Sequence, residues 1–300
     1  MNHLSDLPFE TLVRVTEFLS TKDIVNFSIC SKFLHDLLHV VKLNIKVDFN
    51  TISGLSYFDS FTNVVYKKSA NTFPKLLREL FWNCNENLPN PFPNSLKSLH
   101  LGWNYNQQLP RLPDSLKSLH LSNGYNQLLL QLPNSLKNLH LGSCYNQPLP
   151  RLPDSLQSLS LSFGYNQHLP QLPNSLKSLY LGFCYNQPLP QLPDSLEILH
   201  LGDYYNHQLP RLPNSLNILH LGRKYQKPLP RLPDSLKRLH LDSLYNHLLP
   251  QLPDSLKSLH LSYCYFKILP LLPNSLKYLK VPKDFILPIL PSHITVEFFD

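Results

Sequence analysis

The sequence predicts an α+β fold in which a small N-terminal helical domain precedes a solenoid built on a parallel sheet, with an extended, helix-poor opposite side. The segment Ser-Leu-x-x-Leu-x-Leu/Val starts ten times between Ser95 and Ser275, always twenty residues apart and without an insertion. Leu-Pro pairs follow the copies at a constant distance. Residues 1–50 contain a single proline, Pro8, and their apolar residues recur at helical spacing.

The helical domain, residues 1–50, is predicted to contain three short helices. The first carries apolar residues at three- and four-residue steps after Pro8, which is accepted in a first helical turn. A second continues through Ile24 and Phe27, and a third amphipathic stretch carries Phe33, Leu34, Leu37, Leu38 and Val41. So small a core leaves apolar surface that a partner or the next domain should cover.

Residues 7–38, LPFETLVRVTEFLSTKDIVNFSICSKFLHDLL, resemble an F-box. Leu-Pro-x-Glu opens the motif, Phe-Leu ends its first helix, and Cys-Ser-Lys-Phe stands where the family often has Cys-x-x-Trp. The resemblance implies that these helices bind a Skp adaptor and attach the chain to a cullin RING ubiquitin ligase. The alternative is a helical cap on the solenoid without such a partner. By position in the motif, the implied adaptor contacts are Leu7, Pro8, Leu12, Val15, Leu19, Ile24 and Phe27.

The segments around the repeats are predicted to connect and cap the solenoid. Residues 51–72 form the connector, in which Tyr57, Phe58 and Phe61 should pack. Residues 73–93 contain the same kind of unit with altered spacing, and residues 282–300 contain a shortened last one. Atypical end repeats are expected because a stack must hide its terminal apolar faces and edge strands. The regular repeats then occupy residues 94–281.

Each repeat reads LPxSLxxLxLxxxYNQxLPx, and a fixed period of this length with Leu-x-x-Leu-x-Leu is typical of leucine-rich solenoids. Leu119 and Leu121 alternate with His120, so the leucines should point inward and the histidine outward from a short strand. The Leu-Pro pairs must lie outside the sheet, because proline cannot donate to a strand ladder. With strands about 4.8 Å apart, ten repeats give a parallel sheet about 45 Å long.

Two further repeat positions are assigned to the interior. Tyrosine recurs every twenty residues from Tyr105 to Tyr265 and is expected to form a stacked core column, with the asparagine that follows it bonded to backbone of neighbouring repeats. Cys144, Cys184 and Cys264 share one position, too far apart for a disulfide, and are expected to be buried and reduced. Five cysteines without paired spacing favour a reducing compartment.

The run YNQPLPQLPDSL at residues 185–196 resembles the FNIP repeat, with tyrosine in place of its leading phenylalanine in all nine copies. This resemblance, and a similarity to short, proline-containing bacterial leucine-rich repeats, implies a solenoid that binds other proteins. An F-box followed by such repeats resembles the F-box and FNIP repeat-containing proteins of giant amoebal viruses. The implied location is the cytoplasm or nucleus of an infected host cell.

The histidine position of the repeat predicts a row of imidazoles on one face of the sheet: His100, His120, His140, His200, His220, His240 and His260. A metal or proton site is one interpretation, since neighbouring imidazoles would lie ~5 Å apart, but no acidic residue recurs beside them. A hydrolase built on Ser118 and His120 is weaker, because identical copies recur in successive repeats. We therefore expect neither catalytic residues nor a cofactor, and predict a pH-sensitive protein-binding strip.

A variable position beside the histidine row completes the predicted target-binding face. It carries Trp103, Phe163, Phe183, Arg223 and Tyr263 in different copies, residue types that often dominate binding energy at interfaces. The sequence thus predicts a substrate-recruiting adaptor for a target protein.

Charge leaves a second partner class open. The net charge is +7, and residues 94–281 carry 17 Lys or Arg against 8 Asp or Glu, a net +9. A scaffold or decoy without a role in ubiquitination, and less favourably a nucleic-acid binder, remain the alternatives. No apolar run approaches the roughly 18 residues of a membrane span, so no membrane partner is expected.

Overall fold

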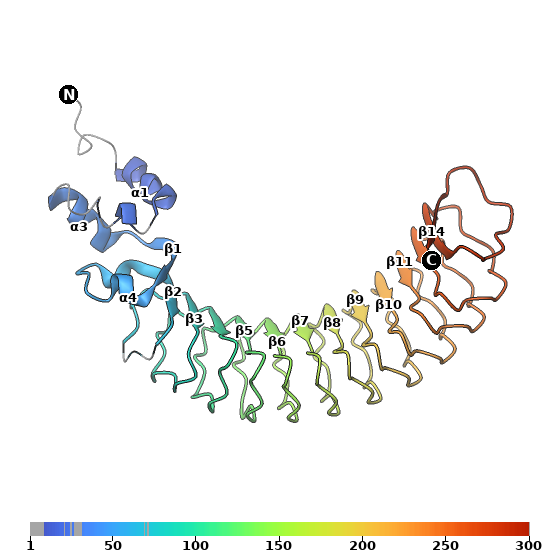
Figure 1. Ribbon diagram of the computed structural model, residues 1–300, viewed down its shortest axis with the longest axis horizontal. Helices are drawn as coiled ribbons and strands as arrows, with labels where there is room; N and C mark the ends of the chain where they lie inside the picture. The colour runs from blue at the N-terminus through green and yellow to red at the C-terminus, as the bar shows by residue number, and fades with distance from the viewer. Residues whose placement is uncertain are drawn as a thin grey trace. The chain divides into compact units, whose positions relative to one another are not determined.

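The computed structural model describes residues 9–20, 22–24, 26, 32–68, 70 and 72–299. The chain divides into two compact units, Met1–Tyr125 and Asn126–Asp300, which are described separately (Figure 1). None of the helices in the described ranges has the length and hydrophobicity of a membrane span.

The first unit begins with helices and continues into parallel strands that follow one another in chain order. The helices are α1 (Phe9–Phe18), α3 (Lys32–Val40), α4 (Phe49–Ile52) and the 3-10 helix η2 (Phe58–Ser60). The strands are β1 (Leu43–Asp48), β2 (Phe61–Tyr66), β3 (Glu79–Trp82), β4 (Ser98–Leu101) and β5 (Ser118–His120).

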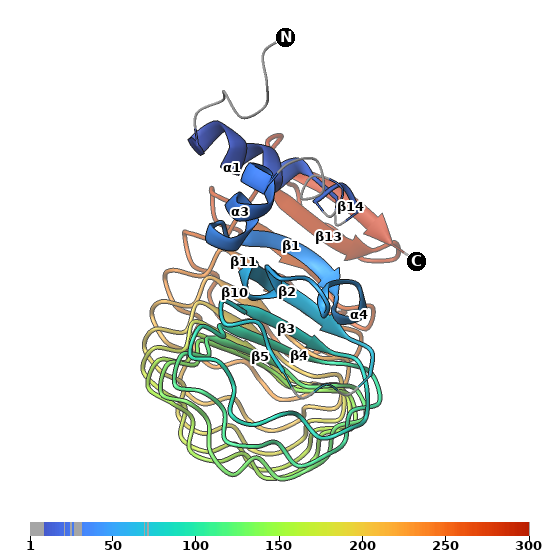
Figure 2. The same cartoon turned by 90° about the vertical axis from the view of Figure 1, so that its left-hand side faces the viewer.

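The second unit consists of solenoid repeats whose strands are all parallel and pair with their neighbours in the chain. They are β6 (Asn138–His140), β7 (Ser158–Ser160), β8 (Ser178–Tyr180), β9 (Ile198–His200), β10 (Ile218–His220), β11 (Arg238–His240), β12 (Ser258–His260), β13 (Tyr278–Pro282) and β14 (Thr295–Phe299). The register advances by twenty residues, as in the pair Leu199 and Leu219. Within this unit the strands lie on the inner side of the bend and helix-free segments close each turn (Figures 1 and 2).

One repeat shows how the sequence makes this turn. Leu216, Leu219 and Leu221 are fully buried, while Ile218 and His220 between them are only half-buried on the outer face of the sheet. The Leu216 N–H donates to the Pro213 carbonyl at 3.1 Å, which closes the turn before the strand. The Leu-Pro pairs of the repeats lie outside the strands in segments that form no helix, as predicted, because proline permits neither a helix interior nor a ladder bond there.

The tyrosine column is confirmed as the centre of the core. Tyr185, Tyr205 and Tyr225 are fully buried, and their rings stack at 6.2 Å with nearly parallel planes. Burial raises the pKa of Tyr205 to about 12, and the backbone N–H of Leu189 offsets part of that rise.

Two side-chain ladders join successive repeats besides the strands. Asn206 accepts at Oδ1 from the Gln226 N–H at 2.9 Å, and its own N–H donates to Asn186 Oδ1 at 3.0 Å, as expected for the asparagine position. The second ladder is formed by the serine of the Ser-Leu-x-x-Leu segment. The Ser215 hydroxyl donates to the Leu196 carbonyl of the preceding repeat at 2.6 Å, and not to the backbone of its own turn. Both ladders link one repeat to the next and repeat along the chain.

The structure differs from the predicted layout in two places. The sheet starts at β1, inside the range assigned to the helical domain, and β2 lies in the segment expected to be a connector. These turns lack the leucine and proline spacing of the repeats, so the periodicity did not indicate them.

Cys144 is exposed and Cys184 and Cys264 are half-buried, so the expectation of buried thiols was wrong. Their position lies in the solvent-facing turn after the strand.

Candidate protein-binding face

The helical region has its own small core, tied to the first strands. Leu37, Leu38 and Val41 are buried, and the Ser60 hydroxyl donates to the Leu38 carbonyl. The Ser56 hydroxyl lies 3.0 Å from His35 Nε2 and 3.2 Å from Nε2 of the next histidine on α3. These contacts hold α3 against the segment that leads into β2.

A short helical stretch between α1 and α3 is capped at its start by two reciprocal hydrogen bonds. The Asp23 N–H donates to Ser20 Oγ, and the Ser20 N–H donates to the Asp23 carboxylate, both at 3.3 Å. This is the arrangement of a capping box, which satisfies backbone donors at a helix start. It fixes Ile24, whose side chain is fully buried.

The predicted adaptor contacts fall into three groups. Leu7, Pro8 and Phe27 lie outside the described residues, as does the side chain of Leu12, whose backbone is part of α1. Val15 and Leu19 are half-buried, so part of each side chain faces outward. Ile24 is fully buried, which makes it a core residue and not a surface contact.

Phe18 was not among the predicted contacts, yet its side chain is almost fully exposed. It lies at the end of α1 and is 87% exposed. The Phe-Leu pair of the motif contained the signal, but helical periodicity cannot say which of two adjacent apolar residues faces out.

The histidine row of the first unit forms a continuous ring stack. The rings of His100 and His120 are parallel at 4.3 Å, and His100 stacks in turn on Phe81 at 4.5 Å. The Lys46 ammonium lies 3.6 Å from the centre of the Phe81 ring, at the other end of the stack. Phe81 thus extends the row of rings by one strand. The strand carries no histidine at this position, so the histidine pattern did not predict it.

The second unit carries a longer stretch of the same row. Tyr180 and His200 lie 4.9 Å apart between ring centres, and His200 and His220 lie 5.0 Å apart. His240 lies between His220 and His260, 3.9 Å from each ring. His140 is exposed, and Ser160 separates it from Tyr180 in the register of the strands.

The row is less basic than its residue type suggests. Burial is the first cause that lowers the pKa of His100, His140, His200, His220, His240 and His260. At His240 the neighbouring imidazoles add to burial, and together they bring the pKa from 6.5 to about 3. These six imidazoles are therefore neutral at pH 7, because packed rings exclude water from one another.

The alternatives of hydrolysis and metal binding can be compared with this geometry. The Ser98 hydroxyl lies 2.9 Å from His100 Nε2, and the Ser118 hydroxyl lies 3.0 Å from His120 Nε2. The same pair in successive repeats belongs to the copied unit and orients the rings of the row. Within the ranges that the structure describes, His, Cys, Asp and Glu side chains form no group of three suited to a metal ion.

The variable position beside the row is exposed as predicted in Trp103, Phe163 and Tyr263. Phe183 is half-buried because its ring stacks on Phe163 at 4.6 Å. Arg223 is engaged, since its Nε lies 3.5 Å from the Asp203 carboxylate.

Tyr204 continues the exposed aromatic surface in the repeat whose variable position carries a charged residue, Asp203. Its ring lies 5.0 Å from Phe183, and the Lys224 ammonium lies 3.7 Å from its centre. We call Phe163, Phe183 and Tyr204 the aromatic row. The sequence concealed Tyr204 because it occupies the position next to the variable one, and only the packing brings the two positions into one line.

Two family models match the chain at the places this geometry singles out. The F-box domain matches residues 4–46. The FNIP Repeat matches six overlapping segments, residues 82–124, 110–144, 125–164, 145–184, 185–224 and 225–264, which together cover more than half of the chain. The chain belongs to the FNIP-repeat family. An F-box joined to repeats of this kind is the architecture of a protein-interaction adaptor.

Solved structures confirm the leucine-rich-repeat type of solenoid for this FNIP-repeat chain. YopM from Yersinia enterocolitica WA-314 is 28% identical with a TM-score of 0.64, over 79% of this chain and 54% of YopM. The crystal structure of CroV588, a circular leucine-rich-repeat protein, is 27% identical with a TM-score of 0.55, over 80% of this chain and 46% of CroV588. The FNIP-repeat chain therefore spans about half the length of these two proteins. No curated protein matches it.

Proposed function

We propose that the protein is a substrate-recruiting adaptor subunit of a Skp-cullin-F-box type ubiquitin ligase. The observation that carries this proposal is the combination, in one chain, of an F-box match at residues 4–46 and a repeat face with an exposed row of stacked aromatic rings. In this function the helical region docks a Skp adaptor and the repeats hold a target protein for ubiquitin transfer.

The exposed end of α1 supports the adaptor part of the proposal. A phenylalanine that is 87% exposed has no core role in its own domain, and burial against a partner stabilises such a side chain by about 2 kcal/mol. Phe18 therefore takes a place in the proposed contact surface, from which the buried Ile24 is removed. The surface then consists of Phe18 with Leu7, Pro8, Leu12, Val15, Leu19 and Phe27.

Co-expression with a Skp adaptor tests this part. We expect the intact chain to retain the adaptor through purification, and Phe18→Ala or the pair Leu7→Ala and Pro8→Ala to lose it. Leu130→Ala, which changes an apolar residue of the repeats that is also exposed, is the matched control and should retain the adaptor. An intact, folded chain that retains no Skp adaptor would refute the ligase role.

The neutral histidine row and the aromatic row support the target part. Neutral rings lose less hydration on burial than charged ones, and aromatic side chains supply much of the energy at protein interfaces. The proposed target contacts are the seven histidines of the row together with Trp103, Phe163, Phe183, Tyr204, Arg223 and Tyr263.

Ubiquitin transfer distinguishes a ligase subunit from a scaffold. A reconstituted complex should modify a bound target, and Phe163→Ser with Phe183→Ser should reduce that transfer while the Skp adaptor stays bound. Arg151→Ala with Gln171→Ala, on the opposite side of the repeats, is the control. Target binding without any transfer would favour the scaffold.

The basic repeats favour one further candidate function, the binding of nucleic acid. Lys237, Lys257 and Lys277 are exposed on successive repeats, at the start of neighbouring strands. A row of cations of this kind attracts polyanions, with an affinity that falls steeply as salt rises. Binding of a single-stranded polynucleotide at low salt, lost on substitution of these lysines, would support this function, and no binding at low salt would remove it.

A further inference from the structure

The last repeat of the second unit breaks the polar pattern of its outer surface. The position after the column tyrosine is Asn in seven of nine copies, but it is Phe266 here and Ile286 in the following segment. The position that carries Arg or Gln in earlier repeats is Leu271. These substitutions are confined to one end of the unit, so they are not a property of the repeat itself.

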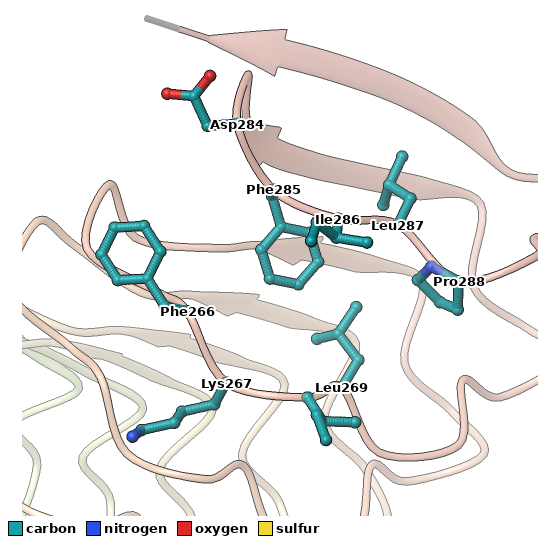
Figure 3. Close-up of a pocket in the computed structure, with 9 residues that line it drawn as sticks. Phe266, Lys267, Leu269, Asp284, Phe285, Ile286, Leu287 and Pro288 are labelled. Atoms are coloured by element: carbon teal, nitrogen blue, oxygen red, sulfur yellow. The ribbon is translucent and has the colours of Figure 1, made fainter.

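These apolar side chains point into solvent. We call Phe266, Ile268, Leu271, Ile286 and Ile289 the C-terminal apolar surface; all five are exposed, Ile286 to 91% and Ile289 to 103%. Between residues 266–269 and 284–288 the surface is hollowed into a mainly apolar pocket of about 450 Å³ (Figure 3). Phe266, Ile268 and Ile286 line this pocket, and large exposed apolar patches mark protein-protein contacts on soluble proteins.

We propose that this surface binds the same surface of a second copy of the chain, in a two-fold symmetric dimer. Its area fits that partner. Each exposed side chain offers on the order of 100 Å² of apolar area, so the five offer about 500 Å². A stable dimer buries about 800 Å² per partner, and about two-thirds of that area is apolar in homodimers. The apolar area that a dimer needs from each partner is therefore close to the area that these five side chains offer.

The charges at the rim of the pocket favour a second copy over an unrelated partner. Lys267 and Asp284 belong to the two segments that line the pocket, and Figure 3 shows their charged ends pointing away from each other. No ion pair joins these two residues. In a two-fold interface residue i of one chain meets residue j of the other, and j meets i, so Lys267 of each copy can pair with Asp284 of its mate. A surface with both signs at its rim is complementary to itself.

Sedimentation or light scattering of the purified chain tests the dimer. Between about 10 and about 100 μM we expect a concentration-dependent mass that approaches twice the chain mass of 34.7 kDa. Ile289→Asp should give a monomer whose circular dichroism spectrum matches that of the wild type, because the charge would be buried only in the interface. Leu130→Asp, at an apolar residue that is also exposed but lies far along the repeats, should leave the dimer intact.

A charge exchange tests the symmetry. Lys267→Asp and Asp284→Lys should each weaken the dimer about tenfold or more, and the two together in one chain should restore it. A monomeric wild-type chain, an Ile289→Asp variant that still dimerises, or single charge variants that weaken a dimer the double variant does not restore would each overturn the proposal.

Discussion

His240 and His260 face each other through their Nδ1 atoms, which lie 3.0 Å apart. At this distance one nitrogen donates its proton and the other accepts it, so the two rings cannot both be protonated there without breaking the contact. His200 and His220 repeat the relationship at 3.2 Å. Each of these two pairs can therefore hold at most one charged imidazole, in agreement with the lowered pKa values.

Acid should destabilise the fold through His240. In the unfolded chain this imidazole takes up a proton near pH 6.5, but in the fold it does so only near a pKa of about 3. As pH falls through this interval the unfolded state binds more protons, so the free energy of unfolding falls. We expect the melting temperature to decrease from about pH 7 to about pH 4.5.

His240→Phe separates this effect from general acid sensitivity, because it keeps a ring in the row and removes the titrating group. The decrease in melting temperature with acid should be smaller in this variant. Asp242, whose charge raises the pKa of His240 and so opposes the effect of burial, is unchanged in this variant. His168→Phe, at an exposed position outside the row, should leave the slope as in the wild type. Equal slopes in all three proteins would contradict the assignment.

The tyrosine column should depend on ring packing more than on the hydroxyl. Tyr205 is fully buried between two stacked tyrosines, so Tyr205→Ala leaves a cavity and should cost about 3–5 kcal/mol. Tyr205→Phe keeps the ring and should cost less than about 1 kcal/mol. Urea unfolding of the two variants measures both values, and similar losses would show that the hydroxyl matters as much as the ring.

The asparagine ladder should contribute through its side-chain acceptors. Asn186→Ala removes the Oδ1 atom that accepts from the Asn206 N–H and should cost about 1 kcal/mol. Amide hydrogen exchange at residue 206 should become faster, since that N–H loses its partner. Asn174→Ala, an exposed asparagine of the same unit outside the ladder, is the control. No change in exchange at residue 206 would contradict the role of the ladder.

Successive repeats lie very close together at the glycine after the strand. A Cβ atom on Gly202 would lie 1.8 Å from the Gly182 carbonyl oxygen, so Gly202→Ala must push two repeats apart. We expect a loss of about 1–3 kcal/mol in the free energy of unfolding. Gly54→Ala, where the added atom meets open space, should change it by less than about 0.5 kcal/mol. A neutral Gly202→Ala would show that the repeats can slide apart without cost.

Much of the fold could be predicted because each repeat is a local pattern copied many times. The alternation of Leu219 and Leu221 around His220 indicates which way each side chain points, and the prolines exclude helices from the opposite side. Where the pattern stops, the prediction stopped as well: β1 and β2 follow no twenty-residue spacing. The contacts of the rings could not be predicted from the sequence either. Phe81 and Tyr204 belong to the rows only because they pack against residues that are distant in the chain.

The twenty-residue period is thus sufficient for the solenoid, for the buried tyrosine column and for an outward histidine position, because side-chain direction in a strand depends only on local backbone geometry. The folded chain adds properties that depend on distance between repeats. Packing of the rings at 3.9 Å buries His240 and lowers its pKa to about 3. At the C-terminal end of the second unit, Ile286 and Ile289 are exposed, so residues of core type form part of a surface.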